Sequence, residues 1–142
     1  MSEPYTGGCA CGNIRFEIRD RPAVMSDCQC RDCQRRSGTG HSSYMAFPSR
    51  SRVTLTGDAK TWDISGDAGT LKRHAFCPVC GSPVYLTFPA MPDLFLVHPA
   101  SLDDPSRYEP QFVTYTASGH AWDRIDPAIQ HFDRMPPRPP EP

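Results

Sequence analysis

Cysteine is the residue type in this chain whose spacing most clearly predicts chemistry. Seven cysteines in 142 residues fall into two pairs and one trio: Cys9 and Cys11; Cys77 and Cys80; and Cys28, Cys30 and Cys33. Thiolates at such short spacings serve as metal ligands or as reactive nucleophiles. In a reducing compartment, spaced cysteines favour these roles over disulfides.

The two pairs together offer the four thiolates that a closed structural zinc site needs. Cys77-Pro-Val-Cys80 is typical of a zinc knuckle, and Gly81 permits the positive φ that such a turn needs. Glycines also flank Cys9 and Cys11, so the backbone can turn tightly there. Two alternatives stay open: two unrelated pairs of buried thiols, and iron in place of zinc, because four thiolates suit both metals.

The trio has no fourth cysteine, which is the ligand count of an open, reactive zinc site. Four plus three cysteines therefore predict two zinc ions per chain, one structural and one reactive. Cys28, Cys30 and Cys33 are the predicted catalytic residues. His41 or His74 would close the second site if either supplied a ligand, and a redox-active thiol cluster without metal is a further alternative.

Three thiolates around Zn²⁺ leave a formal charge of −1, which makes the ion a weaker activator of water than one held by three histidines. Such a site suits an exogenous thiol, which would bind deprotonated. Arg31, Arg35 and Arg36 lie beside the trio and would offset negative charge or bind a substrate carboxylate. Arg35 and Arg36 are the predicted substrate-binding residues; the alternative is a solvated helix face.

Short strands separated by turn residues must position these cysteines. Sixteen prolines oppose long helices, and residues 13–19 alternate with Ile14, Phe16 and Ile18 on one face. One short helix is expected over residues 31–36 and a turn near 126–132. Strands are expected over eight segments: 13–19, 43–47, 52–56, 60–64, 71–76, 84–88, 94–98 and 112–116. The pattern predicts an all-β domain over residues 3–134, followed by a flexible Pro-rich tail, 135–142.

Charge and hydropathy exclude several classes of function. Fifteen basic against 16 acidic residues give a net charge of −1, which argues against non-specific nucleic-acid binding. No apolar run approaches the ~20 residues of a membrane span. The N-terminus lacks the basic start and apolar core of a signal peptide, so a cytoplasmic protein is expected. The sequence has no Gly-rich phosphate-binding loop, so a nucleotide cofactor is not expected.

The adjacent carboxylates Asp103 and Asp104 could serve in acid–base catalysis; the favoured interpretation is that they cap a loop.

Ordered motifs add a family resemblance that runs from Gly7 to about Pro136. They are Gly7-Gly8-Cys9-x-Cys11-Gly12; Cys28-x-Cys30-x-x-Cys33 with Ser37-Gly38; Phe76-Cys77-x-x-Cys80-Gly81-Ser82-Pro83; and Ser101-Leu102-Asp103-Asp104-Pro105. In these the chain resembles the glutathione-dependent formaldehyde-activating enzyme family, which includes the centromere protein V type.

The resemblance implies a β zinc fold of several small antiparallel sheets around zinc knuckles, with one or two short helices. It implies a structural zinc at the two cysteine pairs, Cys9, Cys11, Cys77 and Cys80, and a reactive zinc at the trio, Cys28, Cys30 and Cys33. The activity that it implies is that of a carbon–sulfur lyase, which combines glutathione with formaldehyde into S-(hydroxymethyl)glutathione.

Three functional hypotheses follow. The favoured one is a zinc-dependent lyase acting on an adduct of a small thiol such as glutathione. The others are a non-enzymatic zinc scaffold or protein-interaction module, and a zinc or redox sensor that uses the trio. Two departures from the family bear on the substrate: Gln29 stands where many members have histidine, and Pro99-Ala100 where many have glycine. The sequence leaves the oligomeric state open.

Overall fold

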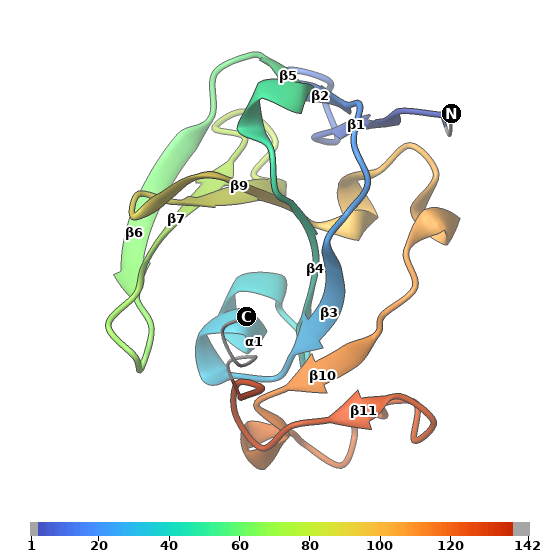
Figure 1. Ribbon diagram of the computed structural model, residues 1–142. Helices are drawn as coiled ribbons and strands as arrows, with labels where there is room; N and C mark the ends of the chain where they lie inside the picture. The colour runs from blue at the N-terminus through green and yellow to red at the C-terminus, as the bar shows by residue number, and fades with distance from the viewer. Residues whose placement is uncertain (1–2, 138–142) are drawn as a thin grey trace. The chain divides into compact units, whose positions relative to one another are not determined.

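The computed structural model describes residues 3–137, and within them the chain is mostly β (Figure 1). The strands are β1 (Tyr5–Gly8), β2 (Arg15–Ile18), β3 (Val24–Cys28), β4 (Ser42–Phe47), β5 (Val53–Thr56), β6 (Lys60–Ser65), β7 (Leu71–Phe76), β8 (Pro83–Phe88), β9 (Met91–Val97), β10 (Phe112–Thr114) and β11 (Gln130–His131). The helix α1 spans Arg31–Ser37, and short 3-10 turns are η1 (Arg50–Arg52), η2 (Pro99–Ser101), η3 (Pro105–Arg107) and η4 (Thr116–Ser118). The all-β prediction and the helix after the second cysteine cluster are confirmed.

The chain forms two compact units. The first unit contains the described residues up to Val24 together with Tyr44–Tyr108, and the second contains Met25–Ser43 with the described residues from Glu109 on. Most of the predicted tail, residues 138–142, lies outside the described residues. No helix within the described part of the chain has the length and apolar character needed to cross a membrane.

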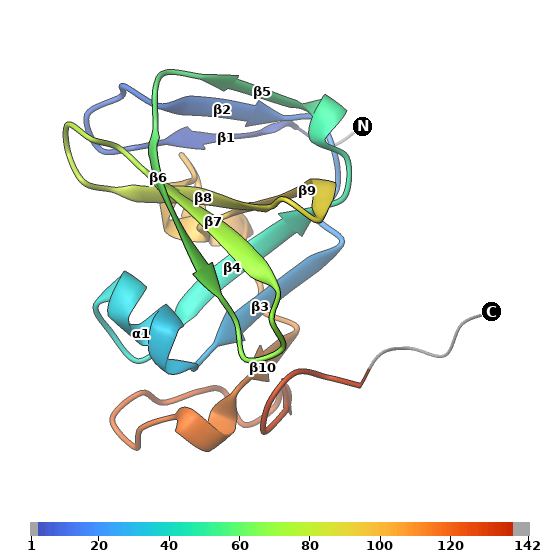
Figure 2. The same cartoon turned by 90° about the vertical axis from the view of Figure 1, so that its left-hand side faces the viewer.

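Antiparallel strands build the first unit (Figure 2). One sheet has the order β1-β2-β5, and the run β4-β9-β8-β7-β6 gives a second series of paired strands. The alternation predicted for residues 13–19 is confirmed, because Ile14, Phe16 and Ile18 are all buried. Facing side chains of β4 and β9 are also fully buried, among them Met45, Phe47 and Phe95. These residues form the apolar core of this unit.

Parallel pairing in the second unit corrects the expectation of antiparallel sheets. β10 pairs in parallel with β3, with Phe112 opposite Ser26, and in parallel with β11, with Phe112 opposite Gln130. Parallel neighbours need a long connection, and here β3 and β10 are separated by most of the chain. The turn expected near 126–132 begins at Asp126, whose carboxylate accepts the Ala128 N–H at 2.9 Å, and leads into β11.

Core packing yields a stability prediction with a matched control. Met45 is 0% exposed in β4, whereas Met91 is 44% exposed at the start of β9. Met45→Ala should lower the free energy of unfolding by about 2–5 kcal/mol, because it leaves a cavity in the core. Met91→Ala should change it by less than about 0.5 kcal/mol, as expected of a surface substitution. Denaturant unfolding of both variants measures the difference, and equal losses would contradict this assignment of the core.

Candidate metal centres

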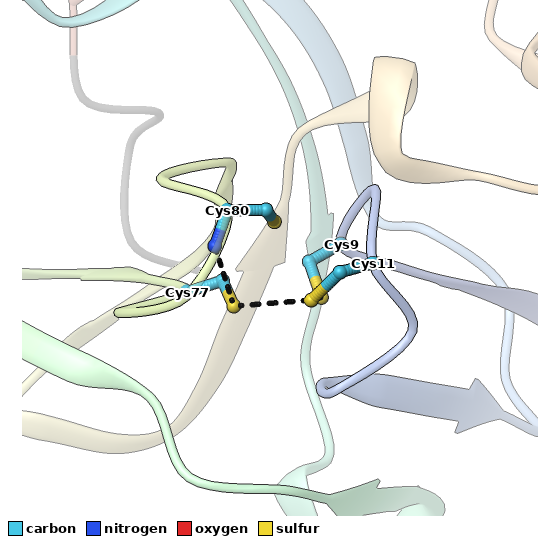
Figure 3. Close-up of side chains that lie close together, drawn as sticks. All are labelled: Cys9, Cys11, Cys77 and Cys80. Atoms are coloured by element: carbon cyan, nitrogen blue, oxygen red, sulfur yellow. Dashed lines mark hydrogen bonds between the residues drawn. The ribbon is translucent and has the colours of Figure 1, made fainter.

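The two cysteine pairs converge on one point in the first unit (Figure 3). Cys9 and Cys11 lie between β1 and β2, and Cys77 and Cys80 lie between β7 and β8. All four Sγ atoms lie within 4.8 Å of one another, and the Cys9–Cys11 and Cys11–Cys77 sulfurs are each 3.7 Å apart. Zinc–sulfur bonds of about 2.3 Å in a tetrahedron place the sulfurs about 3.8 Å apart. The four sulfurs therefore fit one tetrahedral ion.

Local backbone bonds shape the two turns that present these sulfurs. The Cys9 N–H donates to the Ile14 carbonyl at 3.1 Å, which closes the first turn. In the knuckle, the Gly81 N–H donates to the Cys77 carbonyl at 2.8 Å, and Gly81 has a φ of 77°, as its position after the second cysteine predicts. The Ala10 N–H also donates to Ser82 Oγ at 3.2 Å, so the two turns contact each other directly.

Hydrogen-bond donors surround the sulfurs of this cluster. The Ile14 N–H points at Cys9 Sγ (3.2 Å), and the Cys80 N–H points at Cys77 Sγ (3.5 Å). The hydroxyl and the backbone N–H of Ser82 lower the pKa of Cys80 to about 5, and the Cys80 N–H is the main cause that lowers the pKa of Cys77. Donors that favour the charged form prepare these sulfurs to bind a cation.

Cys11 shows how a bound cation would relieve crowding in this cluster. Its pKa rises to about 11, because the Asn13 N–H, which lowers it, is outweighed by desolvation and by the neighbouring sulfurs. Crowded thiols resist full ionisation, since like charges at this distance repel. A bound dication removes that penalty and allows all four to act as thiolates.

The trio lies in the second unit, where β3 passes into α1. Cys28 ends β3, Cys30 is the N-cap of α1, and Cys33 lies in its first turn. The Cys33 N–H donates to Cys30 Sγ at 3.3 Å, and the three Sγ atoms lie within 4.8 Å of one another. Cys28 and Cys33 are buried, while Cys30 is partly exposed. Three converging sulfurs with one partly exposed member fit a metal ion with one open position.

Two thiols of the trio, Cys28 and Cys33, hold their protons more firmly than the thiols of the knuckle. Hydrogen bonding to Cys30 is the main cause that raises the pKa of Cys28. Contacts with Cys28 and Cys30, followed by burial, raise the pKa of Cys33. Without a cation, Cys28 and Cys33 therefore stay protonated at neutral pH.

Neither candidate histidine joins the trio. Within residues 3–137, the group of potential ligand atoms at this position contains the three cysteines and no histidine. His41 Nδ1 instead lies 2.9 Å from both carboxylate oxygens of Asp123. His74 lies in β7, where its ring packs on Trp62 with centroids 4.7 Å apart. Among these residues the structure therefore brings together three potential ligands, all of them cysteines.

The arginines predicted beside the trio occupy different positions on α1. Arg31 begins the helix and donates from Nη1 to Gln34 Oε1. Arg35 and Arg36 lie in the last turn, where positive charge is favourable near the helix C-terminus. Arg35 is exposed to solvent.

The adjacent carboxylates of the Ser101–Asp104 motif serve structural roles, in agreement with the loop-cap interpretation. Asp103 accepts hydrogen bonds from Thr6 Oγ1 (2.8 Å) and from both terminal nitrogens of Arg15, which lowers the pKa of Asp103 to about 2. Asp104 caps η3 by accepting the Ser106 N–H at 3.1 Å. Asp103 thus anchors its turn to β1 and β2, whereas Asp104 is bound within its own turn.

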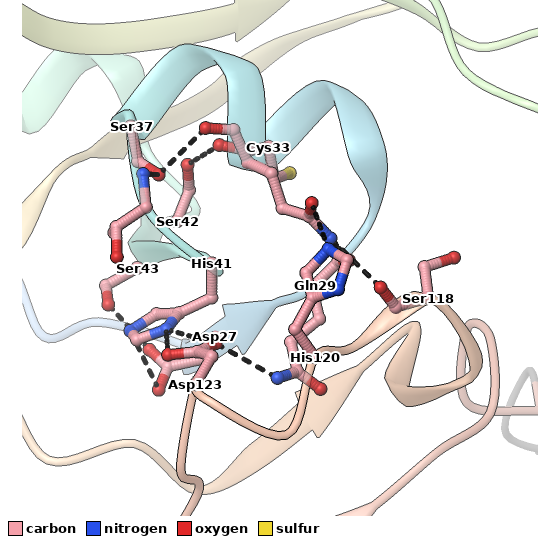
Figure 4. Close-up of polar contacts among 12 residues, drawn as sticks. Asp27, Gln29, Cys33, Ser37, His41, Ser42, Ser43, Ser118, His120 and Asp123 are labelled. Atoms are coloured by element: carbon pink, nitrogen blue, oxygen red, sulfur yellow. Dashed lines mark hydrogen bonds and ion pairs between the residues drawn. The ribbon is translucent and has the colours of Figure 1, made fainter.

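A polar network around the trio has no signature in the sequence (Figure 4). Gln29 Nε2 donates to Asp123 Oδ2 at 3.0 Å, and Gln34 Nε2 donates to the Ser118 carbonyl at 3.0 Å. These partners are more than 80 positions apart, so spacing alone offers no signal for them. His41, which the sequence suggested as a ligand, belongs to this network.

Comparison with known proteins agrees with this arrangement. A family model described as "Glutathione-dependent formaldehyde-activating enzyme" matches residues 4–118, which is well over half of the chain. Among solved structures, a crystal structure of a Rhodobacter sphaeroides protein is similar in fold, with 18% sequence identity and a TM-score of 0.54. The match covers 89% of this chain and 98% of that chain. At this identity the likeness concerns the fold alone.

Substitution within the knuckle tests the structural site. Cys80→Ser should lower the free energy of unfolding by several kcal/mol and remove one metal ion per chain, because metal binding at a closed site contributes to folding. Cys30→Ser is the matched control: serine keeps the helix N-cap, so this variant should lose the other ion while the fold remains. Metal analysis and thermal unfolding measure both effects. A stable Cys80→Ser protein with full metal content would refute the assignment.

Acid should release metal from the trio first. The pKa values of Cys28 and Cys33 are raised, so protons compete strongly for the trio. At the other site the pKa of Cys11 is raised to about 11, but those of Cys77 and Cys80 are lowered. As the pH falls from about 8 to about 5.5, affinity at the trio should decrease earlier, since binding requires the thiols to lose their protons. A colorimetric chelator follows release as a function of pH. Release of both ions at one pH, with collapse of the fold, would contradict the division into two kinds of site.

Proposed function

This chain belongs to the glutathione-dependent formaldehyde-activating enzyme family, and from that premise we propose that it is a zinc-dependent carbon–sulfur lyase. Its reaction would form or break an adduct between a small thiol and an aldehyde, such as S-(hydroxymethyl)glutathione. The observation that carries the proposal is the trio: three convergent sulfurs, one partly exposed, with no fourth ligand in the group among residues 3–137.

The donor set at each site fits zinc, and the proposal assigns two zinc ions per chain. Cys9, Cys11, Cys77 and Cys80 would hold the structural ion, and Cys28, Cys30 and Cys33 the reactive one. When bound at the trio, zinc would supply a fourth coordination position for a thiol and favour its deprotonated form. The partly exposed Cys30 marks the side from which that thiol would approach.

The reaction needs no oxidant or reductant. In the forming direction, a bond joins the thiol sulfur to the carbonyl carbon, the C=O π bond breaks, and the thiol proton ends on the former carbonyl oxygen. The chain's own contribution is to bind and orient the thiol. Cys28 and Cys33, buried on β3 and α1, fix the centre, and their raised pKa values keep these two thiols protonated when no metal is bound.

The arginines of α1 favour a thiol substrate that carries carboxylates. Glutathione has two carboxylates, and guanidinium groups bind carboxylates through paired, charge-assisted hydrogen bonds. Arg35 is exposed in the last turn of α1 and therefore accessible to such a ligand, and Arg36 follows it in the same turn. We assign these two residues to the binding of substrate carboxylates.

The decisive assay follows the exchange between glutathione, formaldehyde and their adduct by NMR. Zinc-loaded wild-type protein should accelerate exchange above the spontaneous background. Cys30→Ser should abolish that acceleration and keep the fold, because it removes one thiolate from the trio while serine preserves the N-cap. Circular dichroism of the variant provides the structural control.

Two negative outcomes have different meanings. If zinc-loaded wild-type protein accelerates exchange for other thiol–aldehyde pairs but not for glutathione with formaldehyde, the wider lyase proposal stands. Glutathione and formaldehyde are then not its substrates. If it accelerates none, the enzymatic proposal fails, and a zinc scaffold or protein-interaction module takes its place.

A further inference from the structure

We infer that His41 and Asp123 form a positioning pair that fixes the geometry of the cysteine trio. The inference deepens the proposed function, since it takes the trio as the reactive metal site. It assigns to His41 a role other than that of a ligand: His41 joins two separate segments, each of which holds residues next to the cysteines in the chain.

The first segment comprises residues 41–43, directly after the loop that follows α1. Ser43 Oγ donates to Asp27 Oδ1 at 2.6 Å, and His41 Nε2 lies 3.8 Å from Asp27 Oδ2. Asp27 immediately precedes Cys28. Ser42 Oγ donates to the carbonyl of Cys33 at 2.7 Å. This segment therefore holds the backbone beside two of the three sulfurs.

The second segment comprises residues 118–123, far along the chain. Asp123 accepts a hydrogen bond from Gln29 Nε2 at 3.0 Å, and Gln29 stands between Cys28 and Cys30. Gln34, which follows Cys33, donates from Nε2 to the Ser118 carbonyl and to the Gln29 carbonyl, at 3.0 and 2.8 Å. Both glutamines are buried. The 118–123 segment thus holds the other side of the cysteine cluster.

The His41–Asp123 contact connects these two segments. His41 Nδ1 lies 2.9 Å from both oxygens of Asp123, so an N–H there donates to the same carboxylate that receives Gln29. The Asp123 side chain is 9% exposed and that of His41 is 27% exposed. An acceptor that is largely shielded from water makes stronger hydrogen bonds than an exposed one. Loss of this contact would weaken the connection between the two segments.

Close packing fixes the carboxylate independently of its hydrogen bonds. A Cβ atom at Gly40 would lie 2.3 Å from Cβ of Asp123, which is too close for any side chain. Likewise, a Cβ atom at Gly119 would lie 2.5 Å from Oε1 of Gln29. The backbone at Gly40 and Gly119 therefore packs directly against Asp123 and Gln29. A substitution at Gly40 is thus a second way to disturb the His41–Asp123 pair without altering either residue.

Metal affinity at the trio provides the test, measured on the full chain with both sites loaded. Outer contacts that orient metal ligands typically account for about 10–100-fold in affinity. His41→Phe and Asp123→Asn should each weaken zinc binding at the trio by about that factor in chelator competition. The ligand-field spectrum of Co²⁺ bound at the trio should also change, because the geometry of the three sulfurs shifts. The site at Cys9, Cys11, Cys77 and Cys80 should keep its affinity and serves as an internal standard.

Three further variants complete the test. His131→Phe removes an exposed histidine whose Nε2 lies 3.0 Å from the Asp126 carbonyl, and it should leave the trio's affinity and the Co²⁺ spectrum unchanged. His41→Asn places an amide N–H near the position of Nδ1 and should retain most of the affinity. Gly40→Ala should reproduce the loss by displacing Asp123, even if His41→Phe fails to fold.

The inference is overturned if folded His41→Phe and Gly40→Ala proteins show wild-type affinity and an unchanged Co²⁺ spectrum. It is also overturned if His41→Asn loses as much affinity as His41→Phe, because the link would then not run through Nδ1. These readouts need no substrate. A protein without lyase activity can still confirm the positioning pair, and an active enzyme can still refute it.

Discussion

Crowding of thiols is the constraint on which the rest of this structure depends. Seven sulfurs gather at two points, within 4.8 Å of their neighbours at each. Ionised sulfurs at such distances repel one another, and protonated sulfurs attract one another only weakly, so they do little to hold the turns together. A dication at each point would resolve the conflict. In the first unit, such an ion would join the turn between β1 and β2 to the turn between β7 and β8, two connections that come from different sheets.

The two clusters meet this constraint in different ways. Around the knuckle, backbone N–H groups and the Ser82 hydroxyl lower the pKa values of Cys77 and Cys80, so the protein itself stabilises part of the negative charge. Around the trio, contacts among the sulfurs and burial raise the pKa values of Cys28 and Cys33. The first arrangement suits an ion that stays in place, and the second suits a centre whose charge depends on what is bound there.

The sequence predicted most of what is local. The cysteine spacing predicted both clusters, alternation in residues 13–19 predicted β2 and its buried face, and the helix after Cys30 lies where it was expected. Three strands were missed for physical reasons. β1 contains two glycines, β3 ends in Ser-Asp-Cys without alternation, and β11 has only two residues, so none has a strand pattern of its own. The parallel pairing of β10 was also missed, because long-range pairing leaves no trace in local periodicity.

Gln29 shows how tertiary contacts change the meaning of a sequence difference. At this position, between two cysteines of the trio, a departure from the family pattern suggested a change in substrate recognition. The side chain is, however, only 4% exposed, and its amide donates to Asp123. Its surroundings favour an indirect effect, because a residue enclosed in this way acts on the trio through the 118–123 segment. Selectivity among thiols would then depend on groups that a ligand can reach, such as the exposed Arg35 in the last turn of α1.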